Sequence, residues 1–273
     1  MKSRLFAPML ASLLLVAGAA LAGSLEDATD AFKRKDYAEA MRLTRPVAEK
    51  GDAVAQYDMG LFYDQGLGVP EDNAEAARWY RLAADQGDSD AQYNLAIMYS
   101  AGEGVPKSDA EAVRLYRLAA AQGDLEALFN LATHLDNGRG VPEDNVEAAR
   151  LYREAADAGQ AKAQANLGIL YLKGEGVDKN PEEGVRWLRK AADQGLPGAQ
   201  ANLSICYERG EGVAKDAVKA YAWQKLAVAN FEPTDKRLKN AQSDLAELAA
   251  RLTPAQLARG DALAETWSHG KGS

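Results

Sequence analysis

Few side chains in this sequence could carry out covalent chemistry. Its 273 residues include two histidines, His134 and His269, and one cysteine, Cys206. The sequence has no serine–histidine–aspartate pattern, no HExxH zinc motif, no CxxC pair and no GxxxxGK[ST] phosphate loop. We therefore predict no catalytic residue, no metal site and no cofactor, and we expect that the protein is not an enzyme.

His134 and Cys206 share one register position in an internal repeat, and the other copies of that position hold Phe62, Met98 and Leu170. We interpret both residues as buried packing side chains, because the position is otherwise apolar. The alternatives are a pH-sensing or ligand-binding role for the histidine and a reactive thiol for the cysteine. With one cysteine in the chain, no intrachain disulfide can form.

A row of polar side chains recurs every 36 residues. The row consists of Asp58, Asn94, Asn130, Asn166 and Asn202. A buried amide must find hydrogen-bond partners, so one interpretation is a structural ladder that links neighbouring backbones. The other interpretation is that the amides line a groove and bind the backbone of a partner peptide. On that second interpretation, the predicted partner-binding residues are Asn94, Asn130, Asn166, Asn202, Gln92 and Gln164.

A second row consists of arginine pairs that could form an anion-binding track. The pairs are Arg78/Arg81, Arg114/Arg117, Arg150/Arg153 and Arg186/Arg189. Three residues before the first arginine of each pair stand Glu75, Glu111, Glu147 and Glu183. Contacts at this i, i+3 spacing stabilise a helix by only ~0.2–0.5 kcal/mol each, but they neutralise the row. We therefore favour a solvated, charge-balanced face.

The elements that carry these rows belong to a repeat of 36 residues. Gly-x-Gly-Val motifs begin at Gly66, Gly102, Gly138, Gly174 and Gly210. They lack the order of a phosphate loop and are interpreted as connectors between helices. We predict five full repeats from residue 53 to about residue 232, preceded by a half repeat. In such an array each unit packs only on its neighbours.

Each repeat contains two segments with helical spacing of apolar residues, such as Ala91, Leu95 and Met98 in the second repeat. The second helices are predicted to begin near Asp109 and Asn145. Positions 55, 91, 127, 163 and 199 are all alanine, as are positions 83, 119, 155, 191 and 227. These columns of small residues let helices approach closely. A tyrosine stripe is predicted to fill the core beside them, and it consists of Tyr63, Tyr99, Tyr171 and Tyr207.

The segment NLAIMY, followed by GEGVPKSDAEAVRLYRLAAAQGD, resembles the Sel1-like repeat, a relative of the tetratricopeptide repeat. The resemblance covers residues 53 to about 232. It implies an all-α fold, an α-solenoid in which antiparallel helix pairs form a right-handed superhelix. It also implies use in protein interaction or assembly, without an activity of its own in most members.

The predicted domain organisation follows from the repeat and from the composition of the two ends. Residues 1–22 contain Lys2 and Arg4, an apolar run of about a dozen residues and small residues up to Ala22, which is typical of a cleavable secretory signal. Residues 23–52 form an N-terminal capping helix and a half repeat, and residues 53–232 form the five repeats. A C-terminal helical cap follows at 233–268, with a flexible tail at 269–273.

Charge and hydropathy limit the partners of the protein. Removing Lys2 and Arg4 from the 32 basic residues leaves 30 against 40 acidic residues, a net charge of −10. This charge disfavours nucleic acid. No second long apolar run follows the signal, so we expect no membrane span. We expect localisation in the bacterial periplasm or outside the cell.

The leading hypothesis is a non-enzymatic protein–protein interaction scaffold or adaptor that binds a protein or peptide segment in its concave groove. One alternative that the resemblance suggests is a cell-wall-associated or β-lactam-acting enzyme. Another alternative is a scaffold of an exopolysaccharide secretion complex. The second alternative differs from the leading hypothesis chiefly in its partner.

Cleavage of the signal after Ala22 should give a mature chain that begins at Gly23. Mass spectrometry of the exported protein measures that N-terminus directly. An exported chain that retains Lys2 would contradict the predicted processing and localisation.

Overall fold

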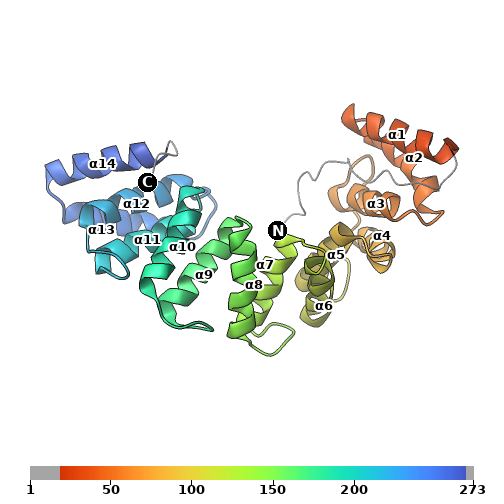
Figure 1. Ribbon diagram of the computed structural model, residues 1–273. Coiled ribbons are helices and arrows are strands. Elements are labelled where there is room, and N and C mark those ends of the chain that lie inside the picture. The colour runs from red at the N-terminus through yellow and green to blue at the C-terminus, as the bar shows by residue number, and fades with distance from the viewer. Residues whose placement is uncertain (1–18, 269–273) are drawn as a thin grey trace. The chain divides into compact units, whose positions relative to one another are not determined.

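The computed structural model describes residues 19–268, which form fourteen helices and no strand within that range (Figure 1). The prediction of an all-α fold built from helix pairs is confirmed. The helices are α1 (Ala19–Lys33), α2 (Tyr37–Ala48), α3 (Ala53–Gln65), α4 (Asn73–Asp85), α5 (Ser89–Ala101), α6 (Asp109–Ala120), α7 (Leu125–Asp136), α8 (Asn145–Asp157), α9 (Ala161–Lys173), α10 (Pro181–Asp193), α11 (Pro197–Arg209), α12 (Ala217–Asn230), α13 (Leu238–Ala250) and α14 (Pro254–Ser268).

The contacts divide the chain into two compact units, residues 1–143 and residues 144–273, which we call unit 1 and unit 2. Within unit 1, each helix from α1 to α7 packs against the next one along the chain. Unit 2 repeats this order from α8 to α13, and α14 packs on α12. We call α3, α5, α7, α9 and α11 the first helices of the five repeats, and α4, α6, α8, α10 and α12 the second helices.

Short polar side chains and glycines set the helix ends. In the second repeat, Ser108 Oγ accepts a hydrogen bond of 3.3 Å from the backbone N–H of Glu111, which starts α6 at the predicted place. The preceding helix ends at Gly102, whose φ of 79° lies in the left-handed region that glycine adopts without a steric penalty. The predicted start of α8 at Asn145 is confirmed in the same way, with Asp144 as its cap.

Alanine columns form the contacts between helices, as the sequence predicts. The side chains at positions 55, 91, 127, 163 and 199 are all 0% exposed, and so are those at 83, 119, 155, 191 and 227. Larger side chains fill the space beside them, and Met59, Leu167 and Leu203 are also 0% exposed. Because the alanine side chain ends at Cβ, neighbouring backbones can lie close together while the larger residues maintain the packing density of a core.

The tyrosine stripe is only partly in the core, so that prediction was wrong for three of its four members. Tyr63, Tyr99 and Tyr171 are half-buried, whereas Tyr207 is buried. A phenol hydroxyl needs a hydrogen-bond partner when its ring is covered, and an arginine of the preceding helix supplies one. The hydroxyl groups accept hydrogen bonds from Arg45, Arg81, Arg153 and Arg189, respectively.

Both ends of the described range are helical, as predicted. At the C-terminal end, Thr253 starts α14: its hydroxyl accepts from the N–H of Gln256 at 3.3 Å, and the Gln256 side chain accepts from the N–H of Thr253 at 2.9 Å. Most of the predicted signal, at residues 1–18, and the predicted tail at 269–273 lie outside the described residues. Within the described range, no helix combines the length and the apolar character that crossing a membrane requires.

Replacing Ala127 by leucine should lower the free energy of unfolding by ~1–3 kcal/mol, because the larger side chain overpacks a contact that is 0% exposed. Chemical denaturation of the purified protein measures this effect. Ala101→Leu, at an exposed position on α5, is the matched control. Equal denaturation midpoints for the two variants would show that the alanine columns do not limit helix approach.

Candidate interaction surfaces

His134 and Cys206, the side chains most capable of chemistry, are buried in packing positions. His134 is 3% exposed, its Nδ1 lies 3.0 Å from the carbonyl oxygen of Arg139, and its ring lies 5.5 Å from that of Tyr116. Burial lowers the pKa of His134. Cys206 is 1% exposed, and burial raises the pKa of its thiol to about 11, so the thiol is protonated at neutral pH. The packing interpretation of both residues is confirmed.

Gln92 and Gln164, two of the predicted partner-binding residues, are buried and make hydrogen bonds inside the protein. Each is 4% exposed. Gln92 Nε2 donates to the carbonyl oxygen of Ala84 at 3.2 Å, and its Oε1 accepts from Gln122 at 2.9 Å. Gln164 makes the corresponding bonds to Ala156 at 3.0 Å and from Gln194 at 2.8 Å. These amides therefore join the end of one repeat to the beginning of the next.

This pair of amide side chains can be recognised in the sequence. Four of the five repeats carry both members, and they are Gln56/Gln86, Gln92/Gln122, Gln164/Gln194 and Gln200/Asn230. The third repeat has Leu128 and Ala158 at the two positions, so both members change together. A paired replacement of this kind indicates two side chains that depend on one another.

The predicted asparagine row lies on the first helices and is buried to different degrees. Asn94 is 3% exposed, whereas Asn130, Asn166 and Asn202 are half-buried. Both polar atoms of the Asn94 side chain are buried without a hydrogen-bond partner of standard geometry. The member of the row in the first repeat is Asp58, which is 6% exposed. The row is therefore more accessible in unit 2 than at its beginning in unit 1.

The residue before each member of the row changes along the array. In α3 that residue is Tyr57, a large ring that lies beside Asn94 of the following first helix and contributes to its burial. In α9 and α11 the corresponding residues are Ala165 and Ala201, which have only a methyl group.

The asparagine row belongs to a longer outward stripe on each first helix, with spacing i, i+4, i+7 and i+11, which places its residues on one helix face. We call these residues the amide stripes. They are Val54, Asp58, Leu61 and Gln65 on α3; Asp90, Asn94, Ile97 and Ala101 on α5; Glu126, Asn130, Thr133 and Asn137 on and just after α7; Lys162, Asn166, Ile169 and Lys173 on α9; and Gly198, Asn202, Ile205 and Arg209 on α11. Apart from Asp58 and Asn94, all of them are exposed or half-buried. Sequence reasoning identified the amides but missed the aliphatic residue three positions later.

The arginine rows of the second helices are balanced inside the chain. Arg78, the first arginine of its pair, lies 2.6 Å from Glu75, and the corresponding pairs in the other second helices are 2.6 to 2.9 Å long. The second arginine of most pairs lies against a tyrosine ring, as Arg81 does at 5.7 Å from the centre of Tyr99. The prediction of a charge-balanced face is confirmed.

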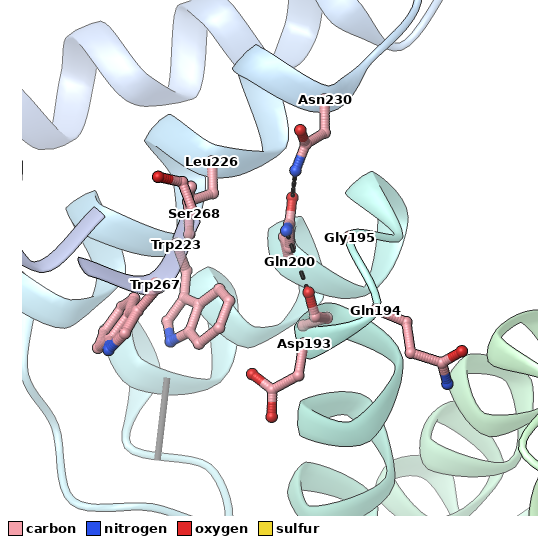
Figure 2. A pocket seen from close by; sticks show the side chains of 10 residues that line it. Asp193, Gln194, Gly195, Gln200, Trp223, Leu226, Asn230, Trp267 and Ser268 are labelled. Atoms are coloured by element: carbon pink, nitrogen blue, oxygen red, sulfur yellow. Dashed lines mark hydrogen bonds between the residues drawn. The ribbon is translucent and has the colours of Figure 1, made fainter. Parts of the chain in front are cut away.

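Unit 2 also contains a cavity of about 260 Å³ near the ends of α10, α12 and α14 (Figure 2). Trp223 and Trp267 stack on one side of it, with ring centres 4.5 Å apart, and the Arg189 guanidinium lies 4.7 Å from the centre of Trp223. On the other side, Gln200 accepts a hydrogen bond of 3.0 Å from Asn230. The stacked rings hold the C-terminal helix against the last repeats.

Comparison with known proteins identifies the repeat. The family model of the Sel1 repeat matches residues 53–88, 89–124, 125–160, 161–196 and 197–230. No curated protein matches the sequence.

Two crystal structures resemble the protein along most of its length. One is c5321, a protective antigen present in uropathogenic Escherichia coli strains and displaying an SLR fold, with a TM-score of 0.82, 34% identity and coverage of 92% of this chain. This chain spans only 54% of that antigen, about half of its length. The other is a Sel1 repeat protein from Oxalobacter formigenes, with a TM-score of 0.76, 29% identity and coverage of 92% of this chain and 97% of that one.

Asp58 should make the stability of the protein depend on pH. Burial, together with the nearby Asp88 and Asp52 carboxylates, raises the pKa of Asp58 to about 8, from about 3.8 in an unfolded chain. The folded state therefore holds a proton that the unfolded state releases. Stability from this group is fully present below pH 4 and is lost as the pH rises toward 8.

Asp58→Asn, which introduces the residue found at this position in the other repeats, should raise the denaturation midpoint at pH 8 and flatten its dependence on pH between 4 and 8. Denaturant titrations at several pH values measure both effects. The control is Asp85→Asn on the exposed face of α4. Parallel pH profiles for the wild type and Asp58→Asn would contradict the assignment of the buried proton to Asp58.

Proposed function

Because the chain belongs to the Sel1 repeat family, we propose that it is a non-enzymatic scaffold that binds a segment of a partner protein on the amide stripes of its first helices. The Sel1 repeat is a protein-interaction module. Many small contacts on a rigid helical array suit the recognition of an extended or helical segment, because little of the array must be ordered on binding.

The observation that supports this proposal most directly is the accessible combination of amide and aliphatic side chains in unit 2. Asn166 and Asn202 are half-buried, and Ile205, which lies on the same stripe as Asn202, is 38% exposed. An asparagine side chain offers both a donor and an acceptor, which matches the N–H and C=O groups of a peptide backbone. The isoleucines supply an apolar contact beside it.

Other polar groups of the protein are less available to a partner. The arginines of the second helices are engaged with glutamates and tyrosines of this chain, so a ligand would have to break those contacts before it could use them. The buried glutamines donate to backbone carbonyl oxygens within the protein. The second helices also expose Leu82, Leu118 and Val146, but the amide stripes combine accessible amide and aliphatic side chains on one helix face.

We also propose that the protein acts after export, in the periplasm or outside the cell. The support is the sequence of residues 1–22, with its basic start, its apolar run and its small residues at the end. Transport to such a compartment is compatible with a chain that has a single cysteine, because no intrachain disulfide is needed to complete the fold.

A photo-crosslinking residue placed at Ile97, Ile169 or Ile205 should yield a discrete protein adduct in the exported fraction, because these positions lie on the amide stripes. The same residue at Leu118, which is 42% exposed on the second helix α6, is the matched control and should give none. Mass spectrometry of the adducts identifies the crosslinked partner. If Leu118 crosslinks to a partner and none of the three stripe positions does, the proposed function is wrong.

A further inference from the structure

The amide stripes of the two units carry opposite charges. In unit 1 the ionisable stripe residues are Asp58, Asp90 and Glu126, and no lysine or arginine stands on the stripes. In unit 2 they are Lys162, Lys173 and Arg209, and no aspartate or glutamate stands on the stripes. The repeat register is the same in both units, so this change of sign is not a consequence of the fold.

The basic residues of unit 2 frame the groups that could bind a peptide. On α9 the order along the stripe is Lys162, Asn166, Ile169 and Lys173, which places a cation at each end, with an amide and an aliphatic side chain between them. The stripe on α11 ends in the same way with Asn202, Ile205 and Arg209. A segment that lies across both helices therefore meets positive charge together with apolar surface.

Acidic neighbours weaken these cations only in part. Lys173 Nζ lies 3.1 Å from a carboxylate oxygen of Glu175, and both side chains are about half exposed. An ion pair this exposed is weak and can exchange one carboxylate for another. Beside Arg209, the Glu208 carboxylate is already held by Arg251 at 2.7 Å. Lys173 and Arg209 can therefore still meet a carboxylate of a partner.

Smaller side chains flank the polar row in unit 2. Tyr57, Tyr93 and Phe129 precede the polar row in the first helices of unit 1, whereas Ala165 and Ala201 take that place in unit 2. Ile205 is 38% exposed, which is a large fraction for an isoleucine in the middle of a helix. Small residues beside an exposed isoleucine leave space for a side chain of a partner.

We propose that unit 2 binds an acidic segment of the partner protein, with carboxylates that meet Lys162, Lys173 and Arg209 and aliphatic side chains that meet Ile169 and Ile205. This proposal rests on the scaffold function above and specifies the chemistry of the segment. Charge complementarity selects this occupant over a basic segment, and a second copy of the chain is an outcome that the test below distinguishes.

The test uses the full mature chain and two fluorescein-labelled peptides of 15 residues, which share their leucines and serines but carry either glutamates or lysines. Fluorescence anisotropy should show that the glutamate peptide binds at least ten-fold more tightly than the lysine peptide, with an affinity that falls as salt is added. The double variant Lys162→Glu/Arg209→Glu should bind the glutamate peptide at least ten-fold more weakly than the wild type.

Lys239→Glu, at an exposed position on α13, is the control and should bind like the wild type. Circular dichroism and thermal midpoints of both variants show that each is folded. The proposal is overturned if the glutamate peptide binds the wild type and the double variant equally, if it binds no better than the lysine peptide, or if neither peptide binds.

The identity of the crosslinked segment distinguishes the acidic-segment proposal from the scaffold function. Adducts at Ile169 and Ile205 should map to a segment with more aspartate and glutamate than lysine and arginine. An adduct with a basic segment or with a second copy, or adducts at Ile97 alone, would overturn the acidic-segment proposal and leave the scaffold function standing. The absence of adducts at all three stripe positions, together with an adduct at Leu118, would overturn both.

Discussion

The close approach of neighbouring helices is the constraint on which the other features of this protein depend. Alanine at 0% exposure stands at both helix contacts of every repeat, so the backbones can come near enough for one repeat to bond to the next. Gln92 uses that proximity to donate to the carbonyl oxygen of Ala84 in the last turn of α4, which also accepts a hydrogen bond of 3.0 Å from the N–H of Gly87. Packing and hydrogen bonding between repeats therefore depend on the same small residues.

Because inward-facing residues make the contacts between repeats, the sequence of the outward faces can vary. The alanines, the core leucines and the buried glutamines recur because each repeat packs on the next in the same way. Most residues on the amide stripes are exposed or half-buried, and their ionisable members change from acidic in unit 1 to basic in unit 2. At Asp58 the variation reaches a buried position, where a carboxyl group replaces an amide and its raised pKa couples folding to pH. The charge of the outward faces thus changes along the array without a change in fold.

Much of the fold could be predicted from the sequence, because a fixed period relates distant residues to one another. The helix pairs, the caps at Ser108 and Thr253 and the buried alanine columns all follow from local chemistry and register. The placement of Tyr99 did not follow, because an amphipathic ring can lie in the core or at its edge. Its position depends on Arg81, 18 residues earlier, which approaches the hydroxyl only when the repeats are stacked.

The candidate site was predicted less completely, for a related reason. Gln92 and Asn94 are two residues apart and both polar, and their spacing does not show which of them bonds to a neighbouring backbone. The burial of Asn94 depends on side chains that reach it from other helices, such as Tyr57. Sequence spacing alone does not show these three-dimensional neighbours.

Carbene footprinting of the mature chain, alone and in complex with its partner, tests most directly the claim that the amide stripes are the working surface. The method labels exposed side chains, so bound surfaces lose label. The account predicts reduced labelling at stripe positions, with Ile205 among them, and unchanged labelling on the second helices at residues such as Leu118. Protection confined to the second helices, with unchanged labelling of the stripes, would contradict it.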